Sequence, residues 1–183
     1  MSVSPYVLGE LLDRLRSADA RLVCVDGPAG SGKTTLAAQL ADALEAPVVH
    51  MDDLYEGWAG GPDVGAANLR RWVLDPLAAG EPARYRRYDW FAEGWAEWHH
   101  VTPSTYLVVE GCGAAARQVD PLGAFRVWVE ADDAERLRRG LRRDGEDARA
   151  DWLRWMTDEA AHYEREGTRQ RADVRLDGFG RLM

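Results

Sequence analysis

The residues with the clearest chemical pattern in this chain of 183 residues lie between Gly27 and Thr34. Gly27, Gly32, Lys33 and Thr34 fit the spacing G-x-x-x-x-G-K-[ST], in which a glycine-rich loop points backbone N–H groups at phosphate oxygens. Lys33 is the only lysine among 23 basic residues. Its compact ammonium on a flexible stem can reach the β- and γ-phosphates as a point charge, unlike a planar guanidinium. The pattern therefore predicts a phosphate loop.

The expected ligands of this loop are ATP and Mg²⁺. The Thr34 hydroxyl is a hard oxygen ligand suited to Mg²⁺. The alternative is a glycine-rich turn that only caps a helix, but four fixed positions match by chance in fewer than about one chain in a hundred of this length. The residues expected to bind the nucleotide are Gly27, Ala29, Gly30, Ser31, Gly32, Lys33, Thr34 and Thr35.

The segments around the loop predict the elements that a phosphate loop requires. Leu22–Val25 is an apolar, partly β-branched run typical of a buried strand, and the glycines and proline that follow cannot continue it. Apolar residues then recur at helical spacing from Leu36 to Leu44. A strand, a loop and a helix thus follow one another in the expected order.

The rest of the chain alternates short apolar runs with helical patterns. Strands separated by helices imply parallel pairing through right-handed crossovers, so the sequence predicts an α/β, three-layer domain over residues 1–183 with a mostly parallel five-stranded sheet. The segment Arg84–Ser104 fits neither pattern and is expected to be irregular, although it is too aromatic for a disordered tether. The further strands are expected at Pro47–His50, Tyr106–Val109, Phe125–Val129 and Ala172–Leu176, and helices in the first twenty residues and at Gly65–Ala79, Asp133–Arg143 and Asp147–Glu166.

Composition limits the partners. A net charge of −8 and a pI near 5 argue against a nucleic-acid surface, which would need a basic stripe. No apolar run reaches membrane length, and the acidic first twenty residues do not resemble a signal peptide. Cys24 and Cys112 lack metal or disulfide spacing and are expected to be buried free thiols. We therefore expect a cytoplasmic protein that binds a small molecule and neither nucleic acid nor membrane, with its oligomeric state left open.

Acidic residues follow three of the predicted strands, at the sheet edge where ligands collect. Asp52 and Asp53 follow the second strand, and Asp52 would stand over the same edge as the phosphate loop. Glu110 is expected to help hold magnesium, because Gly111 permits close approach. Glu130 is instead expected to cap the helix that follows it.

Several segments, in order along residues 21–177, resemble those of uridine kinases. Met51-Asp52-Asp53-Leu54-Tyr55 resembles their D-x-F-Y segment, and Val109-Glu110-Gly111 resembles their E-G turn. Arg138 to Arg142 resembles their arginine-rich lid helix. The remaining matches are Pro76 to Pro82 with Tyr88-Asp89, which resemble the P-L-x-x-G-x-P and Y-D segments, and Ala172-Asp173-Val174, which resembles the last strand.

The resemblance implies a P-loop kinase that moves the γ-phosphoryl group of ATP to a hydroxyl of a small molecule, such as a nucleoside. It implies that Asp52 accepts the hydroxyl proton or holds it through the magnesium shell, and that Thr34 and Glu110 organise the metal with it. Tyr55 and Tyr88 would line the acceptor pocket. The residues that would act on the transferring phosphate are Lys33 and, from the lid, Arg139 and Arg142, for which a solvated helix face is the alternative.

Two departures from uridine kinases leave the acceptor open. The D-H-P segment for the ribose is replaced by residues 56–63, and the histidine that reads the base is replaced by the tryptophan-rich stretch 90–98. Trp58, Trp90, Trp95 and Trp98 either stack on a planar acceptor or fill a core.

The sequence also bears on three other functions. A GTPase would need an N-K-x-D segment, which the lone lysine at Lys33 excludes. An ATPase or nucleotide-binding module shares the loop and stays open. A nucleoside monophosphate kinase would need a cationic acceptor pocket, for which Arg84, Arg86 and Arg87 are available.

Overall fold

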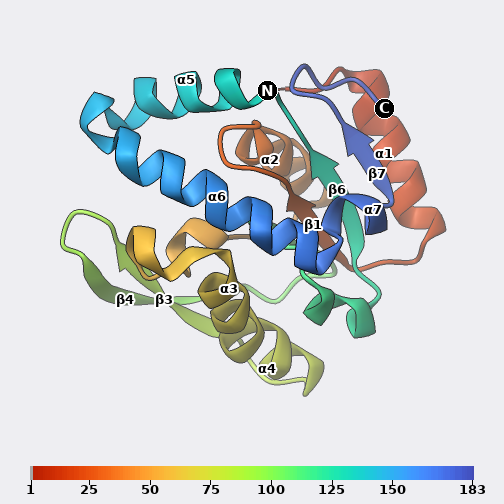
Figure 1. Cartoon of the computed structure of the whole chain (residues 1–183). Coiled ribbons are helices and arrows are strands. Elements are labelled where there is room, and N and C mark those ends of the chain that lie inside the picture. Colours follow the sequence, from red (N-terminus) through yellow and green to blue (C-terminus); the bar gives the residue numbers. More distant parts are fainter. Residues whose placement is uncertain (1) are drawn as a thin grey trace.

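A parallel sheet forms the centre of the protein, and our computed structural model describes it within residues 2–183 (Figure 1). Its five strands in this range lie in the order β2-β5-β1-β6-β7, and each neighbouring pair is parallel. All residues of the central strand β1 are buried, as expected for a strand covered on both faces. The strands are β1 (Leu22–Asp26), β2 (Val48–His50), β5 (Leu107–Glu110), β6 (Phe125–Val129) and β7 (Val174–Leu176).

Helices cover both faces of this sheet and complete the three predicted layers (Figure 1). On one face, α1 (Pro5–Ser17) and α2 (Lys33–Leu44) pack around Val23 and Val25. On the other face, α3 (Gly57–Leu69) and α6 (Arg149–Glu166) pack around Cys24. The two clusters follow from the alternation of side chains along β1. The predicted α/β fold is therefore confirmed.

The helix after β6 begins at the predicted residue, but the residue that caps it differs from the prediction. The helix α5 (Asp133–Asp144) is capped by Asp132, whose side chain accepts the N–H of Ala134 at 2.9 Å. The expectation that Glu130 caps this helix is therefore wrong. Glu130 instead accepts hydrogen bonds from Trp128 and from Arg169, each at 2.6 Å. Arg169 belongs to the short helix α7 (Thr168–Arg171).

The helical segment after β2 starts earlier than predicted. The prediction began a helix at Gly65, but α3 begins at Gly57 and passes through a kink at Gly61, where φ is 65°. A wide π-helical turn at Arg70–Leu74 and the short helix α4 (Asp75–Ala78) complete the segment. The backbone of Gly61 is not helical, so α3 consists of two helical segments that meet at this residue.

The expectation of an irregular segment at Arg84–Ser104 is wrong. The strands β3 (Arg84–Asp89) and β4 (Gly94–His100) form an antiparallel hairpin outside the main sheet (Figure 1). Its turn is stabilised by Asp89, whose Oδ1 accepts the N–H groups of Phe91 at 3.0 Å and Ala92 at 2.9 Å. The hairpin packs against α3, beside the carboxyl end of the main sheet.

Two further expectations can be compared with the structure. Cys24 and Cys112 are both buried and free, as predicted. Among residues 2–183, no helix is both long and apolar enough to span a bilayer.

Candidate functional site

The phosphate loop joins β1 to α2 at the carboxyl edge of the sheet. Gly27, with φ 139°, passes so close to β6 that a Cβ there would lie 2.0 Å from the carbonyl oxygen of Val129. Gly30, with φ 78°, meets the backbone oxygen of Arg136 in the same way, at 2.7 Å. Both positions require glycine, because a side chain would push the loop away from β6 and α5.

Asp26, the last residue of β1, binds backbone groups of the phosphate loop and of the segment that follows β5. Its buried carboxylate accepts the N–H groups of Gly27 at 2.7 Å, Gly113 at 3.0 Å and Ala115 at 2.7 Å. The Tyr163 hydroxyl donates a further hydrogen bond at 2.9 Å. Burial raises the pKa of this carboxyl, and the N–H donors oppose the rise. Asp26 directly follows the predicted strand Leu22–Val25, as Glu110 follows its predicted strand, so the same sequence signal marks it, but it was not among the predicted site residues.

Lys33 points into the loop. Its side chain is nearly enclosed, with 7% of the residue exposed, and Nζ donates to the carbonyl oxygen of Pro28 at 3.0 Å. Burial alone would lower the pKa of Lys33, but its negative surroundings, which include Glu110 and Glu159, raise it above the ordinary value. The residue therefore stays an ammonium, the form that attracts phosphate.

Thr34 and Glu110 meet at the start of α2. The Thr34 hydroxyl lies 3.2 and 3.3 Å from the two carboxylate oxygens of Glu110, which is only 5% exposed. His50 Nδ1 lies 2.7 Å from the same carboxylate. This hydrogen bond to Glu110 raises the pKa of His50.

The donor set of Thr34 and Glu110 fits Mg²⁺, which prefers hard oxygens and usually takes one or two protein ligands together with waters and substrate phosphates. Within residues 2–183, no group of three or more His, Cys, Asp or Glu side chains is arranged to hold a metal by itself.

Asp52 and Asp53 occupy a short 3₁₀ turn, Met51–Asp53, after β2, and their side chains face different neighbours. The Asp52 side chain is exposed to solvent, but protein surrounds part of it. Desolvation and the charge of Glu110 raise the pKa of Asp52, and the charge of Lys33 lowers it. Asp53 accepts a hydrogen bond from the Tyr85 hydroxyl of the hairpin at 3.3 Å. Asp52 is thus the acid that shares the electrostatic environment of the loop.

The two tyrosines expected in an acceptor pocket lie in different surroundings. Tyr55 is 1% exposed, and its hydroxyl donates to the carbonyl oxygen of Cys112 at 2.8 Å, so its side chain is part of the core. Tyr88 is half-buried in the hairpin, beside Gly57 at the start of α3. Tyr55 therefore has no exposed group with which to line a pocket.

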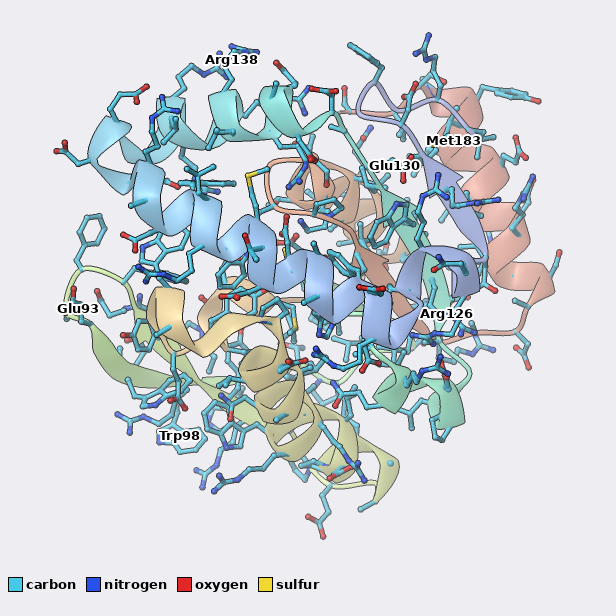
Figure 2. The ribbon with its side chains drawn as sticks, in the orientation of Figure 1. Glu93, Trp98, Arg126, Glu130, Arg138 and Met183 are labelled. Atoms are coloured by element: carbon cyan, nitrogen blue, oxygen red, sulfur yellow. The ribbon has the colours of Figure 1, made fainter. Side chains whose placement is uncertain are left out.

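The arginines of α5 divide between two faces of the helix. Arg139 Nη1 donates to the carbonyl oxygen of Gly30 at 3.2 Å, so it lies at the phosphate loop as expected. Arg142 is exposed and lines a shallow depression with Arg138, and its side chain makes no hydrogen bond or ion pair with any of residues 2–183. Arg138 points outward from the helix in Figure 2. The structure therefore does not bring Arg142 to the site.

Arg143, one turn beyond Arg139, is the arginine that sequence reasoning missed. Its main partner is Asp144, which pairs with it at 2.7 Å and raises its pKa, and the charges of Asp52 and Glu110 add a smaller rise. The positive charge of Arg143 in turn lowers the pKa of Asp52. Helical spacing alone allowed either Arg142 or Arg143 to share a face with Arg139.

The tryptophans pack mainly against each other. Trp58 of α3 makes edge-to-face contacts with Trp90 of the hairpin and with Trp152 and Trp155 of α6, at centroid distances of 5.5, 6.1 and 6.0 Å. Trp90 Nε1 also donates to the backbone oxygen of Asp52 at 3.0 Å. This aromatic cluster joins the hairpin and two helices beside the site.

The hairpin arginines are engaged within the hairpin. Arg86 donates to the carbonyl oxygens of Ala96 at 3.1 Å and Trp95 at 2.9 Å. Arg87 pairs with Glu97 at 2.7 Å, and Arg84 lies over the ring of Trp98.

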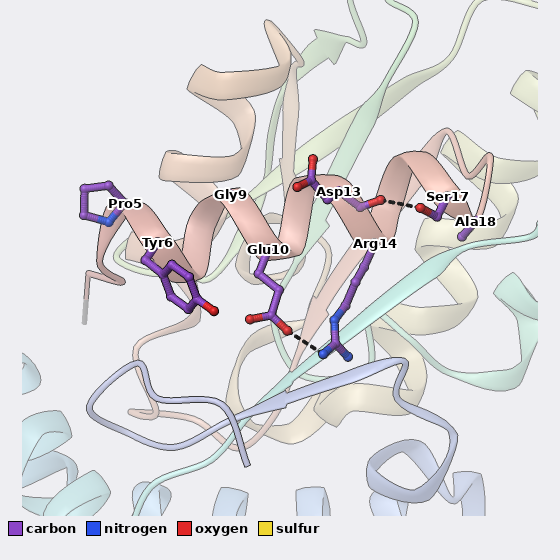
Figure 3. Close-up of a pocket in the computed structure, with 8 residues that line it drawn as sticks. All are labelled: Pro5, Tyr6, Gly9, Glu10, Asp13, Arg14, Ser17 and Ala18. Carbon is purple, nitrogen blue, oxygen red and sulfur yellow. Dashed lines mark hydrogen bonds and ion pairs between the residues drawn. The ribbon is translucent and has the colours of Figure 1, made fainter.

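A hollow of about 770 Å³ lies along the outer face of α1, and Figure 3 shows its lining. Its lining residues all belong to Pro5–Ala18, and none comes from the phosphate loop or from the segments that follow β2 and β5. The hollow is therefore separate from the candidate site.

Residues 23–166, most of the chain, match the AAA_18 family, which is described as an AAA domain. The chain belongs to this family. The matched segment contains the phosphate loop, Asp52, Glu110 and all of α5.

Individual relatives carry kinase names. A solved structure described as a possible uridine kinase from Bacillus stearothermophilus superposes with a TM-score of 0.63 at 22% identity, covering 92% of this chain and 100% of that chain. Cytidylate kinases from two strains of Nitratidesulfovibrio vulgaris, DP4 and Hildenborough, are 46% identical over 58 residues, 29% of this chain. The match spans 25% of the length of those cytidylate kinases. The structural likeness shows a P-loop kinase-like fold.

Proposed function

We propose that this protein is an ATP-dependent phosphotransferase that moves the γ-phosphoryl group to a hydroxyl of a small molecule, with nucleosides as the leading class. The observation that carries the proposal is the convergence of Asp52 with Lys33, Thr34 and Glu110 at one sheet edge. A phosphate loop alone accounts for nucleotide binding. A carboxylate beside it, on a separate strand end, is what a hydroxyl acceptor needs.

The proposed reaction assigns a role to each of these groups. The acceptor hydroxyl oxygen forms a bond to the γ-phosphorus as the bond to the β,γ-bridging oxygen breaks, and ADP leaves. Asp52 takes the hydroxyl proton. Lys33 neutralises charge on the β- and γ-phosphates. Thr34 and Glu110 would hold Mg²⁺, which when bound offsets phosphate charge.

Two arginines complete the proposed charge arrangement. Arg139 lies at the loop, and Arg143, although paired with Asp144, also interacts electrostatically with Asp52 and Glu110, so we assign to both the role of offsetting negative charge on the transferring group. This pair replaces the pair of Arg139 and Arg142 expected from the sequence.

A nucleoside monophosphate kinase is the second candidate, favoured by the match to cytidylate kinases. Such an enzyme must bind the acceptor phosphate with free cations. The three hairpin arginines expected for this task are occupied by carbonyl oxygens, an acidic side chain or an aromatic ring. This engagement supports a hydroxyl acceptor without a phosphate.

The deciding experiment is to incubate the protein with ATP, Mg²⁺ and a panel of nucleosides, nucleoside monophosphates and sugars, and to follow phosphoryl gain by mass spectrometry. We expect gain on a nucleoside, loss of the reaction on chelation, and recovery with Mg²⁺ or Mn²⁺. Gain on CMP would favour the second candidate. Formation of only ADP and free phosphate under every condition would instead identify an ATPase.

A further inference from the structure

The peptide groups of Ala29 in the phosphate loop are held by two side chains from distant helices. The N–H of Ala29 donates to Glu159 Oε2 of α6 at 2.8 Å. The carbonyl oxygen of Ala29 accepts from Arg136 Nη1 of α5 at 3.0 Å. Both backbone groups of this loop residue are therefore fixed from outside the loop.

The two side chains also bind each other. Arg136 Nη1 and Glu159 Oε1 are 2.7 Å apart, and the residues are only 4% and 1% exposed. Asp133 Oδ1 accepts from the other terminal nitrogen of Arg136 at 2.7 Å. A buried ion pair is a weak means of stabilising a fold, because desolvation offsets much of the attraction. Its contacts with Ala29 point to a role in shaping the loop.

This geometry determines the direction of the next N–H group. The peptide between Ala29 and Gly30 is planar and trans, so its carbonyl and its N–H point in opposite directions. Because Arg136 draws the Ala29 carbonyl toward α5, the Gly30 N–H is turned away from α5. Arg139, by holding the carbonyl of Gly30 at 3.2 Å, fixes the following peptide as well.

We infer that Glu159 and Arg136 are positioning residues for nucleotide binding, which hold the Ala29 peptide so that the N–H groups of Gly30 and of Gly32 to Thr34 are preorganised for phosphate. The N–H of Ser31 donates to the carbonyl oxygen of Pro28 at 3.2 Å and closes the turn of the loop. The inference rests on the proposed binding of ATP by this loop. Ala29 itself then serves as the attachment point, since its N–H is already bonded to Glu159.

The test measures nucleotide affinity separately from transfer. Binding of Mg²⁺ with the non-hydrolysable analogue adenylyl imidodiphosphate is measured by calorimetry on the full chain, with melting temperature alongside. Glu159→Gln removes the negative charge of the ion pair. Arg136→Lys keeps the positive charge, but a lysine cannot bind Glu159 and the carbonyl oxygen of Ala29 at the same time. We expect each variant to raise Kd about tenfold, and the double variant to lose no more than the larger single loss, because the two act as one unit.

Asp63→Asn provides a matched control. Asp63 of α3 accepts from His162 at 2.7 Å, and His162 is buried on the same helix as Glu159. This variant makes the same change from a carboxylate to an amide at a contact with α6, but the contact does not include the phosphate loop. It should lower the melting temperature and leave Kd unchanged.

Each outcome decides the inference. Variants that melt early but bind the analogue like wild type would show a purely structural ion pair and overturn it, as would fully additive losses in the double variant. If Glu159→Gln does not fold, Arg136→Lys gives the same comparison. A wild-type protein that binds the analogue but phosphorylates nothing would remove the proposed function alone, whereas one that binds no nucleotide would remove both.

Discussion

At the scale of single residues, Lys33 occupies a site that no arginine can share. Its Nζ lies 3.0 Å from the carbonyl oxygen of Pro28 and 3.8 Å from Cys112 Sγ. We expect Lys33→Arg to lower kcat by about 100-fold, because a guanidinium does not fit this space without displacing the loop. Steady-state ADP formation in the presence of the acceptor measures it, with circular dichroism as a check of folding. Wild-type turnover would contradict the explanation of the lone lysine.

Asp52 and Asp53 provide an internal comparison between neighbours. Asp52→Asn keeps the size of the side chain but removes the proton acceptor, so phosphoryl transfer should fall by about 100-fold or more while ATP binding persists. Asp53→Asn removes a hydrogen bond with Tyr85 of the hairpin and should stay within about threefold of wild type. Single-turnover kinetics distinguish transfer from binding. The reverse order of effects would move the acceptor site to Asp53.

The sequence predicted which residues belong to the site better than it predicted the packing contacts around them. Lys33, Thr34 and Glu110 were placed together because a loop motif and a strand end define their positions locally. Tyr55 was expected at a pocket, but its ring packs against Trp155 and Gly65, contacts between segments distant in sequence. Burial of this kind depends on tertiary packing, which the spacing of residues does not contain.

At the scale of elements, α5 is a second case in which tertiary packing could not be predicted from the sequence. The predicted helix, Asp133–Arg143, ends one residue before the end of the observed helix at Asp144. The rotation of the helix about its axis is set by α6, since a Cβ on Gly140 would lie 2.2 Å from the ring of Trp152. Sequence periodicity did not reveal this contact, and it predicted Arg142 at the site, whereas Arg143 is the arginine whose charge acts on Asp52.

This rotation leads to a prediction for the two arginines. Arg143→Ala should lower the rate of transfer by about tenfold or more with a smaller effect on ATP affinity, because its charge acts on the groups at the site. Arg142→Ala, the matched control at the neighbouring exposed arginine, should stay within about twofold of wild type. Parallel measurements of kcat and ATP affinity test both. Equal losses in the two variants would contradict the observed orientation of α5.

The hairpin of β3 and β4 was missed because its strands mix charged and aromatic residues without a clean alternation of polar and apolar positions. A signal was nevertheless present. Aromatic residues typical of strands flank Asp89 and Gly94, and Asp89 closes the turn through its side chain.

At the scale of the whole molecule, the main sheet was predictable because each strand is a short apolar run. Its order was not, because pairing between strands depends on contacts across the fold. The edge at β6 and β7 is supported by Glu130, which lies beside β6 in Figure 2 and pairs with Arg169 of α7. The hydrogen bond from Arg169 lowers the pKa of Glu130 below its ordinary value of 4.5.

The sign of this shift determines how stability depends on pH. Because the folded-state pKa is lowered, the ion pair stabilises the fold fully above the ordinary pKa, and the contribution is lost as the pH falls through the lowered value. Glu130→Gln should therefore lower the free energy of unfolding at pH 7 by at most about 1 kcal/mol, since the pair is partly exposed. Denaturant titrations should show this difference shrinking in strongly acidic buffer. A difference that is constant with pH would exclude the ion pair as its origin.

The contacts of the loop also have a consequence for the order of events during synthesis. Asp26 binds Gly113 and Tyr163, which lie 87 and 137 residues later, and Ala29 binds Glu159, which lies 130 residues later. The ribosome thus completes the G-x-x-x-x-G-K-T segment long before it makes the residues that shape it. A nascent chain stalled before α6 would carry the whole motif but lack the loop geometry, so we expect ATP to protect the chain from proteolysis only after Glu159 has emerged.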